Sequence, residues 1–197
     1  MTTVAGICSC KGKWPHSSHA QLNDFSIGCV NKAMIELKPA FIDDIPRLWA
    51  LRTRAVRVSC ASHYSSAQID IWSATTAPET YLRLIASQGA LIAEEHGQLR
   101  GYAILDLQTG EVDAIFVDPD HGGKGIGKQL LQGIEALALQ HAFRRLYLFA
   151  SLNAVAFYQA AGFIAIRDEE YVHPSGIILR SLYMEKVLPE SAVTPEQ

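Results

Sequence analysis

Hydrophobic and polar residues alternate in some stretches of this chain and recur at a helical period in others. Residues 34–39 alternate, which predicts a strand with one buried face. Residues 45–56 follow a helical period. Asp43 or Asp44 precedes them as an N-cap, and Pro46 falls in the first turn, where its missing N–H does no harm. The same patterns predict short helices at 67–72 and 78–87, and then hairpin strands at 90–94 and 99–107 turned at His96-Gly97. A strand at 112–117 and a long helix from Ile126 follow. The last predicted elements are a strand at 146–150, a helix ending at Gly162, a strand from 164 to about 167 and a strand at 177–186.

This order of elements predicts one α/β domain over residues 34–188. Consecutive antiparallel strands followed by helix, strand, helix and strand give a mixed, mostly antiparallel sheet with helices on both faces. The acidic residues 168–170 are expected to form a loop, and Pro174-Ser175-Gly176 a turn. Residues 1–33 show neither period and look like an irregular tail, while 189–197 are a polar end.

The stretch between the strand at 112–117 and the long helix predicts an anion site. Asp118-Pro119 end the strand, and Gly122, Gly123, Gly125 and Gly127 follow. Backbone N–H groups from Gly122 to Lys128 have no partners inside the helix, and the helix dipole adds partial positive charge there. Lys124 and Lys128 supply mobile charge.

Two nucleotide motifs fit this loop poorly. In the dinucleotide fingerprint G-x-G-x-x-G, a third glycine should stand where Leu130 is, and no βαβ unit precedes the loop. In a P-loop, Gly122, Gly127 and Lys128 satisfy G-x-x-x-x-G-K. However, Gln129 replaces the Ser or Thr whose hydroxyl would hold magnesium. A P-loop nucleotide-binding protein therefore stays only as an alternative.

The loop and a second block together resemble the GNAT superfamily of acyl-CoA-dependent N-acyltransferases. Val117-Asp118-Pro119 and the segment from Gly122 to Gly127, Gly-Gly-Lys-Gly-Ile-Gly, are similar to the family's V-x-P and Q/R-x-x-G-x-G/A pattern, with Gly122 at the Gln/Arg position. Some way downstream, the segment from Asn153 to Phe163 resembles N-x-x-A-x-x-F-Y-x-x-x-G-F. Two motifs in this order are more specific than either alone, and the resemblance covers roughly residues 34–188.

The resemblance implies transfer of an acetyl group from acetyl-CoA to a primary amine of a small molecule or peptide. The pyrophosphate would lie on the N–H groups of the glycine loop, and the two central strands would splay to admit the pantetheine arm, helped by a bulge in the strand at 111–117. A CoA-binding module without catalysis is the other alternative. The residues expected to bind the cofactor are Ile115, Phe116, Val117, Gly122, Gly123, Lys124, Gly125, Ile126, Gly127, Lys128 and Asn153, the last as a pantetheine contact or a helix cap.

Two residues are candidates for proton transfer. Glu111 stands eleven residues before the Gln/Arg position, where some GNAT enzymes carry a general-base glutamate; otherwise it is a strand-edge charge facing water. Tyr158 matches the family's tyrosine that protonates the departing thiolate; otherwise it is a packed ring. Alternation places Asp113 on the same face as Glu111 and makes it a weak candidate for substrate binding.

The segment between the first two helices would form one wall of the acceptor pocket in this family. His63 and Tyr64 are therefore candidate acceptor contacts, with loop packing as the simpler interpretation. Trp72 is expected in the core.

Composition and charge argue against some classes of binding partner. Hydrophobic residues make up 49%, charged residues 19%, and the formal net charge is −3, so nothing favours nucleic acid. No apolar run approaches the ~20 residues of a membrane span, which predicts a cytoplasmic protein.

The N-terminal tail contains five residues of the types that ligate zinc, but without the spacing of standard zinc motifs: Cys8, Cys10, His16, His19 and Cys29. We therefore expect no metal. The tail is either a leader before a true start at Met34 or an arm that pairs with a second subunit in a homodimer.

Overall fold

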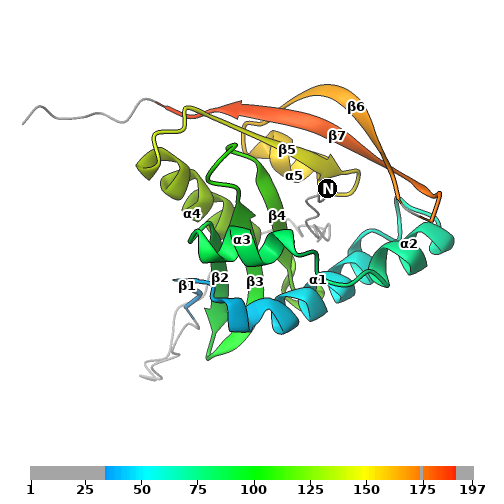
Figure 1. Ribbon diagram of the computed structural model, residues 1–197, viewed down its shortest axis with the longest axis horizontal. Helices are drawn as coiled ribbons and strands as arrows, with labels where there is room; N and C mark the ends of the chain where they lie inside the picture. The colour runs from blue at the N-terminus through cyan, green and yellow to red at the C-terminus, as the bar shows by residue number, and fades with distance from the viewer. Residues whose placement is uncertain (1–33, 174, 190–197) are drawn as a thin grey trace, which may run out of the picture.

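A computed structural model describes residues 34–173 and 175–189 of the 197-residue chain (Figure 1). The predictions for residues 1–33 and 190–197, including the cysteines and histidines of the tail, lie outside the described residues. In chain order the elements are β1 (Glu36–Pro39), η1 (Ile42–Asp44), α1 (Ile45–Ser59), α2 (Ser66–Ser73), α3 (Thr80–Ala86), β2 (Ala90–Glu95), β3 (Gln98–Leu105), β4 (Val112–Val117), η2 (Pro119–His121), α4 (Ile126–Gln140), β5 (Arg145–Ser151), α5 (Val155–Ala160), β6 (Ile164–Val172) and β7 (Ile178–Val187).

The strands form two antiparallel sheets that meet at β4 and β5. The first sheet has the order β1-β2-β3-β4, and the second has the order β5-β7-β6. An isolated parallel bridge pairs Glu111 with Tyr147, where the Tyr147 N–H donates to the Gly110 carbonyl at 3.3 Å. Beyond this bridge no ladder joins β4 to β5 among the described residues, and Figure 1 shows the two strands diverging. The splay expected of the central strands is confirmed.

A bulge lies at Asp113, in the strand where one was expected. Leu105 pairs with Val112 whereas Ile104 pairs with Ala114, which leaves Asp113 as the extra residue on β4. The strict alternation that predicted one common face for Glu111 and Asp113 therefore does not hold at this point.

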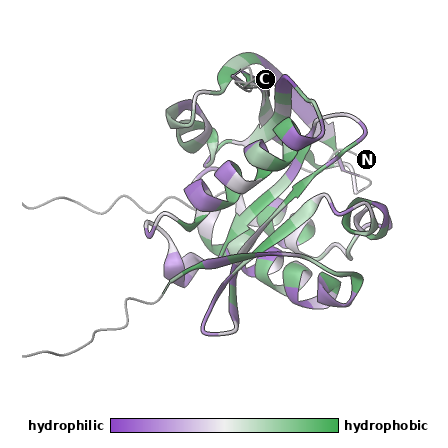
Figure 2. Ribbon diagram, turned by 90° about the vertical axis from the view of Figure 1, so that its left-hand side faces the viewer, coloured by the Kyte–Doolittle hydropathy of each residue, from purple (hydrophilic) through white to green (hydrophobic). Residues whose placement is uncertain are grey.

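Two hydrophobic clusters pack against opposite faces of the first sheet. Val112, Ile115 and Val117 of β4 belong to the cluster that includes α4 and α5, and Ala114 and Phe116 belong to the cluster under α1, α2 and α3. All six residues of β4 are buried for this reason. Figure 2 shows the strands through the middle of the molecule mostly in the hydrophobic colour, with hydrophilic residues on the outer sides of helices and at loop tips.

Two local predictions are wrong in an informative way. Residues 168–170 do not form a loop, because β6 continues to Val172 and pairs with β7 throughout, with Asp168 opposite Leu182. Most of β6 is exposed, so its acidic residues keep their water in spite of being in a strand. Asp44 does occupy the N-cap position of α1, but its carboxylate accepts the Phe41 N–H at 2.8 Å instead of capping the helix.

Candidate functional site

The glycine loop is held in a shape that requires its glycines. Gly123 (φ +74°) and Gly125 (φ +83°) both have left-handed backbone conformations, and Gly125 lies immediately before the first residue of α4. Nothing lies within 4 Å of a Cβ built on either residue, so the loop is open on that side. A Cβ on Gly127 would meet Phe157 at 3.4 Å and Val117 at 3.6 Å, which shows how closely α4 approaches α5 and β4 here.

The backbone N–H groups of this loop are unpaired, as the anion-site prediction requires, with one exception. The Gly122 N–H donates to the Pro119 carbonyl at 3.3 Å, so this group is already used. From Gly123 to Lys128 the backbone N–H groups have no hydrogen-bond partner among the described residues. Six successive unpaired donors at the N-terminus of a 15-residue helix suit an anionic group, and its binding there stays a prediction.

The loop opens into a groove of about 600 Å³ between α4 and α5. Six residues predicted to bind a cofactor line it: Val117, Gly123, Gly125, Ile126, Gly127 and Lys128. The prediction missed the others, which are His121, Leu131, Gln132, Glu135, Phe157, Ala160, Ala161 and Lys186. Five other residues predicted to bind the cofactor do not line the groove: Ile115, Phe116, Gly122, Lys124 and Asn153.

Some of the missed residues had a signal in the sequence and some did not. Lys128, Gln132 and Glu135 recur at helical spacing after the loop, so they lie on one side of α4 and could have been found. Lys186 comes from β7, and its Nζ donates to the Glu135 carboxylate at 2.6 Å across 51 residues of chain. Only the tertiary fold brings these two residues together.

A cluster of charges fixes the start of the loop to α1. The buried Asp118 carboxylate pairs with Arg54 of α1, accepts the Asp120 N–H at 3.0 Å and lies 3.3 Å from the His121 ring. Burial raises the pKa of Asp118, but the Arg54 guanidinium and the Asp120 amide outweigh it and hold the pKa below its usual range. Asp118 therefore stays ionised at neutral pH and anchors the loop.

Tyr158 lies in α5 and is fully buried. Its ring packs edge-on against Phe157 and Phe163, with centroids 5.2 and 5.5 Å away. The hydroxyl has no hydrogen-bond partner among the described residues, and burial raises its pKa. A buried, unpaired hydroxyl costs free energy unless a bound group supplies its partner.

Glu111 lies at the bridge between the two sheets and is partly buried. One carboxylate oxygen, Oε2, accepts from the Tyr147 hydroxyl at 3.5 Å, while Oε1 is buried without a partner among the described residues. Burial and, second, the charge of Asp106 raise the pKa of Glu111. The residue is not the water-facing strand-edge charge that was the alternative interpretation.

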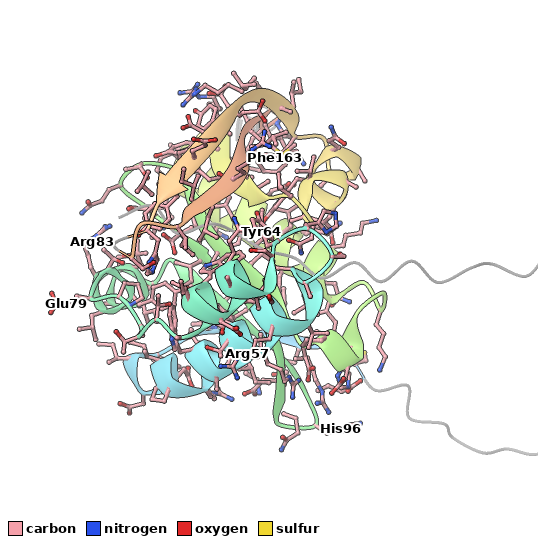
Figure 3. The ribbon with its side chains drawn as sticks, turned by 90° about the vertical axis from the view of Figure 1, so that its right-hand side faces the viewer. Arg57, Tyr64, Glu79, Arg83, His96 and Phe163 are labelled. Carbon is pink, nitrogen blue, oxygen red and sulfur yellow. The ribbon has the colours of Figure 1, made fainter. Side chains whose placement is uncertain are left out.

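The candidate acceptor contacts are spread over different environments. The Tyr64 hydroxyl donates to the Arg180 carbonyl at 2.6 Å and accepts the Leu152 N–H at 3.0 Å, so it joins the segment before α2 to the second sheet (Figure 3). His63 is exposed beside Ser62. Asp113 is buried, and its charge contributes to raising the pKa values of Tyr81 and Tyr102, after burial.

Two further predictions have clear outcomes. Trp72 is 5% exposed and belongs to the core, as expected. Asn153 does not cap α5, because the N-cap is Ala154 and no side chain accepts there; the Asn153 side chain instead accepts from the Cys60 thiol at 3.3 Å. Its role as a pantetheine contact stays a prediction.

Two kinds of feature are absent from the described residues. Within residues 34–173 and 175–189, no group of three or more His, Cys, Asp or Glu side chains is placed to hold a metal ion. Over the same part of the chain, no helix combines the length and apolar character needed to cross a membrane.

Comparison with known proteins gives a consistent result. A sequence profile described as an acetyltransferase (GNAT) domain matches residues 60–186. The chain is 27% identical over 141 residues to the uncharacterized N-acetyltransferase YafP of Escherichia coli K12, and the match covers 72% of this chain and 88% of YafP.

Solved structures share the fold over most of their length. A GCN5-related N-acetyltransferase from Rhodopseudomonas palustris superposes with a TM-score of 0.71 at 26% identity, covering 79% of this chain and 97% of that protein. The PaiA N-acetyltransferase of Thermoplasma acidophilum, solved with coenzyme A, superposes with a TM-score of 0.63 at 23% identity over 78% of this chain and 99% of that one.

Proposed function

The chain belongs to the GNAT acetyltransferase family, and we propose that it transfers an acetyl group from acetyl-CoA to a primary amine of a small molecule or peptide. The observation that carries the proposal is the run of unpaired N–H groups from Gly123 to Lys128 at the mouth of a groove that extends along α4 and α5. Backbone donors at a helix N-terminus suit a pyrophosphate, and Lys128 adds a positive charge.

The separation of β4 from β5 suits the pantetheine arm. Past the Glu111–Tyr147 bridge, the side of β4 turned away from β3 has no strand partner among the described residues. An extended amide-containing chain bonds to such a strand as an added strand does. The thioester would then lie between the cofactor groove on one side and Glu111 on the other.

Glu111 and Tyr158 would move the protons. An amine with a pKa near 10.4 is free of its proton only about once in 2,500 molecules at pH 7. In this proposal Glu111 accepts that proton, and its raised pKa brings it nearer to neutral pH, where a general base is most effective. The free amine nitrogen then bonds to the carbonyl carbon, and the carbon–sulfur bond breaks. The Tyr158 hydroxyl donates its proton to the departing thiolate, and the second proton, which the nitrogen loses as the amide forms, restores that hydroxyl.

The test is thiol release from acetyl-CoA with a panel of amines, amino acids, aminoglycosides and peptides, with the acetylated product identified by mass. We expect release that depends on at least one amine and matches the product in stoichiometry. A protein that binds acetyl-CoA by calorimetry but releases no thiol with any acceptor would instead be a CoA-binding module without catalysis.

A further inference from the structure

Three aromatic rings form a continuous surface on one face of the second sheet. Tyr147 and Phe149 come from β5 and Tyr183 from β7, and their ring centroids are 5.4 to 6.4 Å apart. All three rings are only partly buried. We call these three residues the aromatic surface.

The aromatic surface faces away from the cofactor groove. Leu146 and Leu148, which alternate with these rings on β5, are fully buried in the cluster that includes α4 and α5. On β7, Leu179 has the same orientation as Tyr183 and is buried in the cluster under α1 and α2. The rings therefore lie on the α1–α2 side of the sheet, just beyond the part that these helices cover.

This surface begins at the proposed base. The Tyr147 hydroxyl donates to Glu111, and the same two residues form the bridge after which β4 and β5 separate. If the cofactor occupies the groove on the α4–α5 side, an acceptor reaches the thioester from the opposite side. It then passes over the rings.

One carboxylate beside the rings has no cationic partner among the described residues, and this is Glu111 next to Tyr147. Glu185, opposite Tyr147 on β7, accepts from the Tyr183 hydroxyl at 2.6 Å and is already paired with Arg145 at 2.8 Å. The Arg167 guanidinium already lies over the Tyr183 ring, 4.0 Å from its centroid. Because its side chain is 54% exposed, Arg167 can leave the ring without breaking a buried contact.

We propose that the aromatic surface binds the amine acceptor, and that this acceptor is a small amine with an aromatic ring near its amino group. The inference rests on the proposed function and names the substrate class of the same site. Glu111 would meet the ammonium group, while Tyr147, Phe149 and Tyr183 would stack with the ring.

The first experiment compares two acceptors of similar size on the unaltered protein. 2-Phenylethylamine and 2-cyclohexylethylamine differ in that only the first has a flat π-system, and the same thiol-release assay measures both. We expect kcat/KM to be at least about 10-fold higher for the phenyl compound. Equal values, or a preference for ring-free amines or peptides, would overturn the inference and leave the proposed function standing.

The second experiment removes one ring. Tyr183→Leu keeps apolar bulk and should raise the KM for 2-phenylethylamine about 10-fold, with the acetyl-CoA KM unchanged and the cyclohexyl compound little affected. Phe41→Leu is the control, because Phe41 is 69% exposed at the far end of the first sheet. A phenyl-to-cyclohexyl ratio that Tyr183→Leu does not change would overturn the inference. Absence of thiol release with every amine would overturn the proposed function and this inference together.

Discussion

The two sides of the junction between β4 and β5 present different chemical groups: mainly backbone groups on one side and side chains on the other. On the side of α4 and α5, the candidate binding groups are backbone N–H groups and glycines beside a closely packed cluster in which Tyr158 is fully buried. On the side of α1 and α2, they are half-buried side chains, with Glu111 beside the aromatic surface. Backbone recognition depends on a helix start and on left-handed residues, so it leaves a motif in the sequence. Side-chain recognition depends on which strands become neighbours.

The largest expected effect on ligand binding is on the backbone side and concerns Gly125→Asp. The new carboxylate would lie among the N–H donors and repel a pyrophosphate, a clash worth several kcal/mol, so acetyl-CoA affinity measured by calorimetry should fall by more than about 100-fold. Gly97→Asp is the matched control, because Gly97 (φ +74°) also has no atom within 4 Å of a built Cβ but lies in the β2–β3 turn. If both variants bind alike, the anion site is elsewhere.

Tyr158→Phe should lower turnover without lowering the stability of the protein. If the hydroxyl protonates the thiolate, turnover should fall by ~10²–10⁴-fold with acetyl-CoA affinity nearly unaltered. The melting temperature should hold or rise, since the change removes an unpaired buried hydroxyl. Tyr102→Phe is the comparison: this fully buried hydroxyl pairs with Tyr81 at 3.3 Å, so its loss should cost about 1 kcal/mol and spare activity. If Tyr158→Phe turns over as fast as the wild type, Tyr158 is a core residue and not the acid.

Two neighbours on β5 test whether the two sides differ in packing. Leu148 is fully buried toward α4 and α5, and Leu148→Ala should lower the free energy of unfolding by about 2–5 kcal/mol. Phe149 faces the other side and is partly exposed, so Phe149→Ala should cost only about 1–2 kcal/mol despite removing a larger group. Urea denaturation measures both, and equal losses would mean that the aromatic surface is packed like the core.

The smallest effect is expected for Glu111→Gln. Turnover should fall about 10-fold at neutral pH and recover at alkaline pH, where free amine is abundant.

Glu111→Gln should also change how stability depends on pH. The pKa of the Glu111 carboxyl is higher in the folded state than its value of about 4 in the unfolded state. Above pH ~4 the folded state therefore holds more protons than the unfolded state, and the carboxyl lowers the free energy of unfolding as pH rises. The variant should therefore melt about 1–3 °C higher at pH 7 and show no gain below pH ~4. A pH–rate profile parallel to that of the wild type would make Glu111 structural.

Most of the fold could be predicted because its elements are signalled locally. The strand 112–117 has the predicted bounds, and α4 begins at the predicted Ile126, because Asp118-Pro119 and the glycines end one element and start the next. β6 was cut short in the prediction, since 168–170 carry three acidic residues. Pairing with β7 outweighed that local signal, because an exposed strand does not have to bury its charges.

The site could be predicted only where chain neighbours form it. The loop from Gly123 to Lys128 is one such segment, and all of its residues except Lys124 line the groove. Glu111 was chosen by its position, but its contact with Tyr147 spans 36 residues and no local pattern encodes it. The groove contact between Lys186 and Glu135 depends on β7 in the same way.

The separation of β4 from β5 also has a consequence for how long the protein survives in a cell. A strand without a neighbour on one side is incomplete, and a cofactor that bonds along it finishes the sheet as well as occupying a site. At a free concentration 100 times its Kd, such a ligand adds about 2.7 kcal/mol to the free energy of unfolding. If acetyl-CoA binds there as proposed, resistance of the protein to proteases should rise with the acetyl-CoA concentration.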